Sequence, residues 1–140
     1  MTALVLERRF AVPIGRVFDF VSKSEFLLQW WGPEGMTCTG NLDLSRPGPW
    51  DSTMVSPNGS FTVSGQVTKV TRPNLVAFTW GWHDENGKRG HESHVMIELE
   101  AEGDGATKFT LTHRDLADEE SKANHNDGWT SSLRKLDAVL

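Results

Sequence analysis

The sequence predicts an α+β fold in which a curved antiparallel β-sheet and two short helices wrap around a long C-terminal helix. Two observations carry this prediction. Apolar and polar residues alternate through most of residues 36–113, which is the period of half-buried strands. Apolar residues recur at helical spacing in two places, first after residue 13 and again over residues 129–140. The expected order is therefore one strand, two short helices, about six strands and one long helix.

The N-terminal region predicts one strand followed by two helices. Leu4, Leu6 and Phe10 share one parity and begin the first strand. Pro13 suits the first residue of a helix, where its missing N–H costs nothing. That helix carries a stripe at i, i+3, i+4 and i+7, formed by Ile14, Val17, Phe18 and Val21. Ser24 is expected to cap a second short helix that carries Leu27, Trp30 and Trp31 and ends at Gly32-Pro33.

The middle of the chain predicts a meander of antiparallel strands. Alternating segments cover residues 36–45, 61–68, 76–82, 95–99 and 109–113. Turn signals separate the strands, at Pro57-Asn58-Gly59, Arg72-Pro73-Asn74, Asn86-Gly87 and Gly103-Asp104-Gly105. Pro49 lacks a ladder donor, so the strand near Trp50 is expected to begin after it or to lie on an edge.

One hairpin has a register that can be predicted. A two-residue turn at Asn86-Gly87 pairs Glu85 with Lys88 and Asp84 with Arg89, both of opposite charge. The same register continues outward through four more pairs, which bring the apolar faces of both strands together: Trp82–His91, Trp80–Ser93, Phe78–Val95 and Val76–Ile97. A slip of one residue would invert one strand, so the agreement favours this register.

The last segment predicts one amphipathic helix. Asp118 is the expected N-cap, and Glu119 and Glu120 favour the positive end of the helix dipole. The apolar stripe consists of Trp129, Leu133, Leu136 and Leu140. This helix is expected to cover the concave face of the sheet.

Composition limits the classes of function. The 140 residues are expected to form a single domain over residues 1–140, with a net charge of −5 and no basic stripe, so no nucleic-acid partner is expected. No apolar run approaches a membrane span, and the N-terminus lacks the layout of a signal peptide. Cys38 is the only cysteine, which fits a reduced, cytoplasmic protein without membrane insertion. No cofactor is expected.

Several local motifs resemble one superfamily. They include Arg8-Arg9-Phe10 with Pro13, Trp30-Trp31-Gly32-Pro33, Arg46-Pro47-Gly48 before Trp50, Leu111-Thr112-His113, and Gly128-Trp129. With the order of elements, they resemble the START-like (SRPBCC) superfamily of the helix-grip fold. Within it, the chain resembles the bacterial single-domain relatives of the activator of the heat-shock chaperone ATPase. The match spans essentially the whole chain, although Pro49 stands where similar proteins commonly have glycine.

The resemblance implies a cavity between the sheet and the last helix, and it leaves the function open. Members of the superfamily bind lipids, hormones and polyketides, and a minority catalyse cyclisation or dehydration, so the fold does not decide among them. Our first hypothesis is binding of a small apolar or aromatic molecule. The alternatives are a cyclase- or dehydratase-type enzyme and a co-chaperone-like interaction module with a chaperone partner. A homodimer through a sheet edge is a further alternative, which no sequence feature demands.

The first hypothesis rests on six tryptophans in a chain without tyrosine, and on inward strand parity. Adjacent helical positions diverge by about 100°, so one of Trp30 and Trp31 is expected to face the cavity. The expected ligand-binding residues are Trp31, Phe61, Val63, Phe78, Trp80, Trp82, His91, Val95, Ile97, Phe109, Leu111, His113, Trp129 and Leu133. His113, and His91 near the mouth, would supply polar contacts.

Histidines carry the chemical alternatives. His113 faces inward and is the one catalytic candidate, as a general acid or base; the competing interpretation is a buried imidazole satisfied by the protein itself. A metal site is not expected in the 83–94 region. His83 and His94 share a face but lie roughly 13 Å apart along the ladder, too far for two ligands of one zinc ion.

Overall fold

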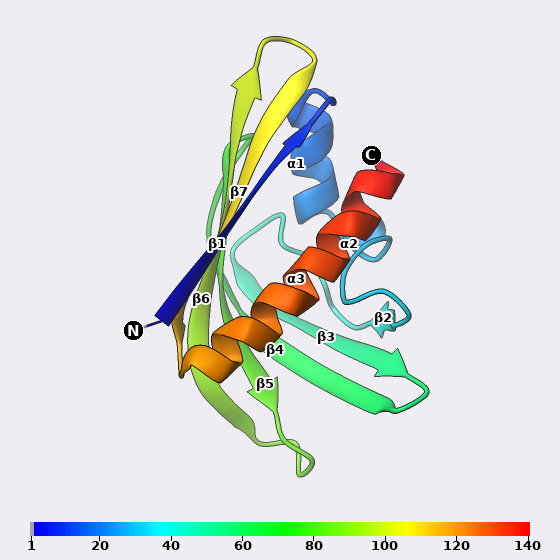
Figure 1. The fold of residues 1–140 in the computed structure, drawn as a ribbon, viewed down its shortest axis with the longest axis vertical. Helices are drawn as coiled ribbons and strands as arrows, with labels where there is room; N and C mark the ends of the chain where they lie inside the picture. Colours follow the sequence, from blue (N-terminus) through cyan, green and yellow to red (C-terminus); the bar gives the residue numbers. More distant parts are fainter. Residues whose placement is uncertain (1) are drawn as a thin grey trace.

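The computed structural model describes residues 2–140, and it shows a seven-stranded antiparallel sheet curved around one long helix (Figure 1). The strands are β1 (Thr2–Phe10), β2 (Thr37–Thr39), β3 (Gly48–Ser56), β4 (Gly59–Thr71), β5 (Leu75–His83), β6 (Arg89–Glu102) and β7 (Ala106–Leu116). The helices are α1 (Ile14–Ser22), α2 (Ser24–Leu27) and α3 (Glu119–Val139). The predicted order of elements is confirmed.

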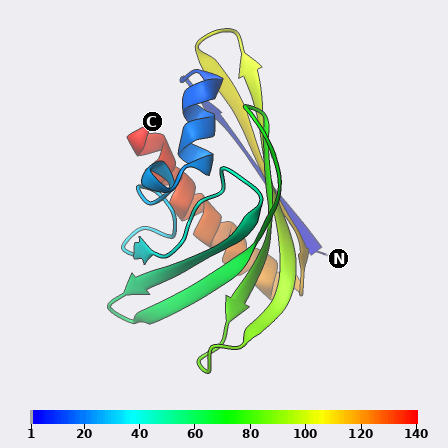
Figure 2. The ribbon, with the colours of Figure 1, turned by 180° about the vertical axis from the view of Figure 1, so that it is seen from behind.

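The strands β2 to β7 form a meander, and β1 is added at its edge beside β7. The order of the sheet is β1-β7-β6-β5-β4-β3-β2, so β1 lies beside the last strand and β2 forms the opposite edge. Figure 2 shows α1 and α3 on the same side of the sheet, with β1 passing behind the upper part of α1. The helix α1 packs against β6 and β7, and α3 packs against β1 and β7. One concave face is therefore covered by helices, as the fold class predicts.

The strand parities agree with the burial of side chains. On β5 the inward residues Val76, Phe78 and Trp80 are buried, and on β6 Val95, Ile97 and Leu99 are buried. The predicted pairs Val76–Ile97, Phe78–Val95 and Trp80–Ser93 are all present. Asp118 caps α3 as expected, because its side chain accepts the backbone N–H of Ser121 at 2.8 Å.

The tip of the β5–β6 hairpin differs from the prediction. The register shifts between Gly81 and His83, so His83 pairs with Arg89 and the Trp82–His91 pair is lost. The backbone N–H of Asp84 then bonds to the Lys88 carbonyl, and the expected Asp84–Arg89 and Glu85–Lys88 pairs do not form. A bulge adds an unpaired residue to one strand and increases the local twist. The charges at the turn do not predict this bulge.

The expected strand over residues 36–45 is mostly wrong. Only Thr37–Thr39 pairs with β3, and the chain leaves the ladder at Gly40, whose φ is +121°. A Cβ at that position would lie 2.8 Å from the Asp51 carbonyl oxygen, so the turn requires glycine. Leu42 and Leu44 are nevertheless fully buried, because this loop folds inward and the Leu44 N–H bonds to the Ser22 carbonyl. Alternation in the sequence therefore reflected burial without a strand.

Three smaller expectations are also resolved. Ser24 is the first residue of α2 and makes no capping bond, so the expected cap is wrong; Lys23 holds the N-cap position. Pro13 holds the N-cap position of α1, one residue before the expected one, and its carbonyl accepts the N–H groups of Arg16 and Val17. The strand β3 already includes Pro49, whose only neighbouring strand is β4, because β2 reaches no further than Thr53. The edge position predicted for Pro49 is confirmed.

Candidate functional site

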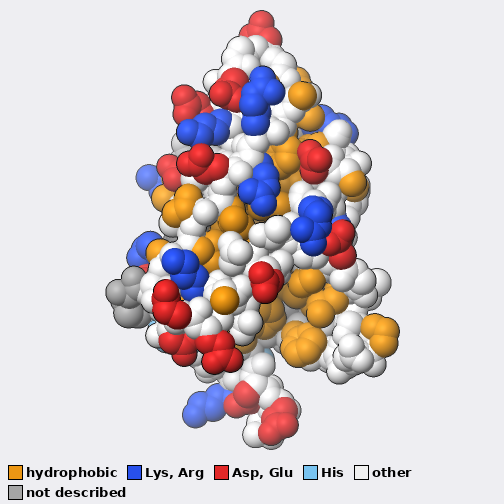
Figure 3. All heavy atoms as spheres, in the orientation of Figure 1, with side chains coloured by type: hydrophobic (Ala, Val, Ile, Leu, Met, Phe, Trp, Pro, Cys, Tyr) orange, Lys and Arg blue, Asp and Glu red, His pale blue; other side chains and the backbone are white. Residues whose placement is uncertain are grey.

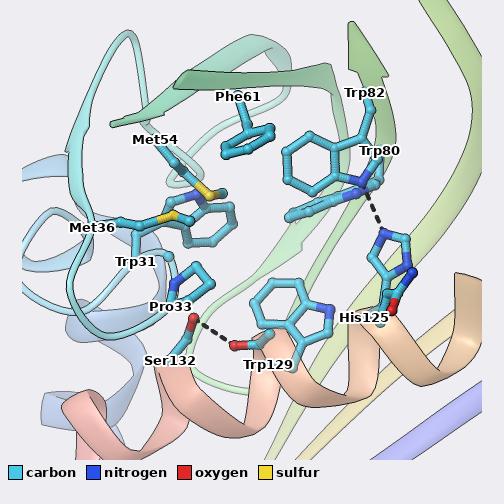
Figure 4. Close-up of a pocket in the computed structure, with 13 residues that line it drawn as sticks. Trp31, Pro33, Met36, Met54, Phe61, Trp80, Trp82, His125, Trp129 and Ser132 are labelled. Atoms are coloured by element: carbon cyan, nitrogen blue, oxygen red, sulfur yellow. Dashed lines mark hydrogen bonds between the residues drawn. The ribbon is translucent and has the colours of Figure 1, made fainter. Parts of the chain in front are cut away.

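A pocket of about 190 Å³ lies between the concave face of the sheet and the middle of α3. Figure 4 shows aromatic side chains facing one another across it, with Trp129 and His125 rising from the helix below. Its walls are formed by Trp31, Gly32, Pro33, Met36, Met54, Phe61, Trp80, Trp82, Asn124, His125, Gly128, Trp129 and Ser132. None of these residues is an aspartate, glutamate, lysine or arginine.

Four indoles from three parts of the chain form the walls. Trp80 and Trp82 lie two residues apart on β5 and therefore point to the same face of the sheet. Trp31 follows α2, and Trp129 lies on α3. The Trp80 and Trp129 ring centroids are 5.2 Å apart, those of Trp31 and Trp129 are 5.6 Å apart, and those of Trp31 and Trp80 are 5.8 Å apart. Rings at these separations make favourable tilted and edge-on contacts. The indoles are thus packed against one another in one cluster, and the pocket is the open space beside that cluster.

The mouth of the pocket is formed by more flexible side chains than its indole walls. Met54 on β3 pairs with Phe61 on β4, and Met36 precedes β2. Phe61 is 47% exposed, which is unusual for a side chain of its size in a chain whose other phenylalanines are mostly buried. Hydrophobic side chains gather on this face of the molecule, over β3 and β4 beside α3 (Figure 3). Flexible thioethers beside an exposed ring form a mouth that adapts to shape.

Gly128 keeps space open on the helix side. It lies in the interior of α3, where glycine costs about 0.5–1 kcal/mol relative to alanine. A Cβ at Gly128 would meet only Pro33 Cγ at 3.9 Å, which is an ordinary contact. Alanine would therefore fit, whereas a longer side chain would extend toward Pro33 and the pocket that both residues line.

His125 is the one titratable side chain among the residues that line the pocket. Its Nε2 accepts the Trp82 Nε1–H at 2.9 Å, and its Nδ1–H donates to the Ser121 carbonyl at 2.7 Å. Burial lowers the pKa of His125 below its usual value, partly offset by the bond to Ser121. The ring is therefore neutral at pH 7, and the pocket has no formal charge.

The structure divides the predicted ligand-binding residues into two groups. Five of them line the pocket: Trp31, Phe61, Trp80, Trp82 and Trp129. Eight do not line it and are buried in the packed core between sheet and helices: Val63, Phe78, Val95, Ile97, Phe109, Leu111, His113 and Leu133. His91 lines a neighbouring pocket of about 200 Å³, which shares Trp80, Trp82 and His125 with the first. The inward face is thus partly filled and partly open.

His113 is held inside a chain of hydrogen bonds. Its Nδ1 accepts the Trp129 Nε1–H at 3.1 Å, so the neutral ring carries its proton on Nε2, which donates to Ser93 Oγ at 2.7 Å. The Ser93 hydroxyl donates to the Trp80 carbonyl. Burial lowers the pKa of His113 to about 3, aided by the neighbouring His125 and His94. Both nitrogens are occupied and the side chain is fully buried, which favours the structural interpretation over a catalytic one.

The remaining reactive side chains are engaged elsewhere. The Cys38 thiol bonds to the Trp31 carbonyl at 2.9 Å, and burial raises the pKa of Cys38, so the thiol stays protonated. The hairpin histidines are also bonded within the protein: His83 to Ser64 and Gly87, and His94 to the Asp115 carboxylate. His91 Nε2 bonds to the Asp115 carbonyl at 2.7 Å.

Sequence reasoning missed several pocket residues. His125 lies four residues before Trp129, so extending the helical stripe by one turn would have found it. Met54 shares its parity with Trp50 on β3, which is also a visible signal. Met36 lies in the segment 36–45 that alternation predicts as a strand, and the structure begins β2 at the next residue, Thr37. Gly128 has no side chain, so it gives no pattern that points to a pocket.

Known proteins agree with this architecture. The structure of an AHSA1 protein from Silicibacter pomeroyi is 50% identical, with a TM-score of 0.93 over 98% of this chain and 96% of that one. A protein from Chromobacterium violaceum is 20% identical with a TM-score of 0.85, covering 100% of this chain and 98% of its own. CalU16 from Micromonospora echinospora is 19% identical, with a TM-score of 0.67 over 96% of this chain and 71% of its own. The last two show the fold alone.

Two further findings complete the comparison. No curated protein sequence matches the chain. No helix within residues 2–140 is long and apolar enough to cross a membrane. The family model described as "Activator of Hsp90 ATPase homolog 1-like protein" matches residues 11–140. Because this match covers nearly the whole chain, the protein belongs to the family of activator of Hsp90 ATPase homolog 1-like proteins, which have the helix-grip fold.

Proposed function

We propose that the protein binds a small apolar or aromatic molecule in the pocket between the sheet and α3. The observation that carries this proposal is the pocket itself: about 190 Å³, walled by four indoles and bordered by Phe61, Met36 and Met54. Such a site gains affinity mainly from buried ligand surface, and a few polar groups set the orientation. The proposed contacts are Trp31, Phe61, Trp80, Trp82 and Trp129, with His125 at the polar side.

The position of Gly128 supports the same proposal. Glycine in the interior of a 21-residue helix weakens that helix, and no close backbone contact requires it here, because a Cβ would meet nothing nearer than 3.9 Å. The residue instead leaves room at the pocket. An enzyme that uses His113 receives no comparable support, since both ring nitrogens are bonded within the protein.

Direct binding can be measured with N-phenyl-1-naphthylamine, a neutral apolar dye that fluoresces in dry surroundings. Titration into the protein is expected to raise dye emission and to quench tryptophan emission by energy transfer, because four of the six indoles line the pocket. Saturable binding with a one-to-one stoichiometry supports the proposal. Dye emission that rises only when the protein is unfolded or aggregated would contradict it.

Gly128→Leu is expected to weaken dye binding at least about tenfold, because the added side chain occupies pocket volume. Gly128→Ala is the matched control, since its Cβ makes only an ordinary contact. Both variants should keep or raise the thermal midpoint, because both residues favour helix over glycine. Equal affinities for the two variants and the natural protein would place the dye elsewhere.

A further inference from the structure

The six indole N–H groups of the chain fall into two sets. Four of them donate to protein acceptors: Trp30 to the Phe20 carbonyl, Trp50 to the Thr79 carbonyl, Trp82 to His125, and Trp129 to His113. The other two, Trp31 and Trp80, have no hydrogen-bond partner at Nε1 among residues 2–140. Both side chains are more than nine-tenths buried, at 1% and 4% exposure.

Both unpaired donors belong to side chains that line the pocket. Trp31 and Trp80 each line it, and their rings are in contact, with centroids 5.8 Å apart. Buried polar groups in native proteins are nearly always paired, so two unpaired donors of the same kind at one pocket require an explanation. A bound molecule that presents an acceptor to them supplies one.

The rest of the wall defines what that molecule can be. Both nitrogens of His125 are already bonded, and the Ser132 hydroxyl donates to the Gly128 carbonyl at 3.0 Å. No lysine or arginine lines the pocket, so a buried carboxylate would have no counter-charge and would be costly. Asn124, an exposed lining residue, has an amide that can both donate and accept. The buried lining side chains that lack a partner are donors, so the buried part of the pocket requires acceptors in a neutral and apolar setting.

We propose that the ligand is a neutral apolar or aromatic molecule that carries a hydrogen-bond acceptor, such as a carbonyl or ether oxygen, for the Nε1–H groups of Trp31 and Trp80. This inference rests on the ligand-binding function proposed above and names the chemical class of the ligand. Neighbouring side chains shield both nitrogens, so the bond forms when an indole turns toward the pocket that its ring already lines (Figure 4).

Competition for bound N-phenyl-1-naphthylamine, excited directly, tests the proposal with three naphthalenes of similar shape. They are 2-acetylnaphthalene, which has an acceptor, 2-isopropylnaphthalene, which has none, and 2-naphthoate, which is charged. The ratio of ketone to hydrocarbon affinity is the readout, because it cancels general changes in the pocket. Trp31→Phe and Trp80→Phe remove the N–H and keep an aromatic ring. At least one of them is expected to lower the ratio about 3- to 10-fold, the contribution of a neutral hydrogen bond.

Trp82→Phe is the matched control, because it removes an N–H that already bonds to His125. It is expected to change both affinities and leave their ratio within about twofold. An unchanged ratio in both Trp31→Phe and Trp80→Phe overturns the proposal while the binding function stands. Naphthoate that binds more tightly than the ketone also overturns it. Absence of dye binding to the natural protein would instead overturn the binding function, and this inference with it.

Discussion

Gly65→Ala is expected to destabilise the protein by at least about 3 kcal/mol, because an added methyl group has nowhere to go. A Cβ at Gly65 would overlap the Thr79 carbonyl oxygen and lie 2.6 Å from the carbonyl carbon, both backbone atoms of β5. Trp50 lies opposite Gly65 on β3, and its indole N–H reaches the same Thr79 carbonyl. The indole therefore crosses β4 where β4 has no side chain.

Urea unfolding of Gly65→Ala and Gly90→Ala measures this effect. Gly90 lies on β6, where the nearest heavy atom to an added Cβ is the Trp82 carbonyl oxygen at 3.6 Å, so its variant should stay within about 0.5 kcal/mol of the natural protein. The Gly65 variant should also show a changed tryptophan spectrum, because Trp50 packs against Phe78 and Trp80. Equal stability of the two variants would mean that β5 moves away easily.

Acid is expected to destabilise the protein through His113. The pKa of His113 is about 3 in the folded protein and about 6.5 when the chain is unfolded. Between these values the unfolded chain binds a proton that the folded chain does not, so lowering the pH favours unfolding. The contribution of the neutral His113 to the free energy of unfolding is fully present above pH 6.5, and it is lost as the pH falls toward 3. It amounts to about 3 kcal/mol between pH 7 and pH 4.

The His113 share can be isolated with His113→Gln, whose amide can accept from Trp129 and donate to Ser93 without titrating. Urea unfolding at pH 7, 6, 5 and 4 should show a slope of stability with pH that is shallower in the variant by that amount. His125, whose pKa is also lowered, titrates in both proteins and cancels. NMR of the imidazole nitrogens should show a neutral His113 with its proton on Nε2 from pH 7 to pH 5. A protonated His113 at pH 5 in the folded protein would contradict this account.

Much of the fold could be read from local patterns. Alternation of period two predicted which side of β5, β6 and β7 faces inward, and the Phe78–Val95 and Trp80–Ser93 pairs followed once the turn was located. Asp118 could be recognised as an N-cap because capping depends on residues within one helical turn. The motifs Trp30-Trp31-Gly32-Pro33 and Gly128-Trp129 were enough to indicate the family that the whole-chain match shows.

Local patterns failed where long-range contacts decide the backbone. The loop after Gly40 buries Leu42 and Leu44 by bonding to Asp51 on β3 and to Ser22 at the end of α1, which lies far from the loop in the sequence. The bulge between Gly81 and His83 accompanies bonds from Arg89 to the Ser64 carbonyl on a third strand. Neither event leaves a periodic signal.

The sequence by itself determined the order of elements, the inward face of β5, β6 and β7, the family and the abundance of indoles. The tertiary structure alone decided which inward side chains fill the core and which border open space. Parity states the side of a sheet, whereas the open space at the pocket depends on how α3 lies against the curved sheet. The same holds for the unpaired donors of Trp31 and Trp80, because an indole N–H is satisfied or not according to neighbours that only the folded chain brings together.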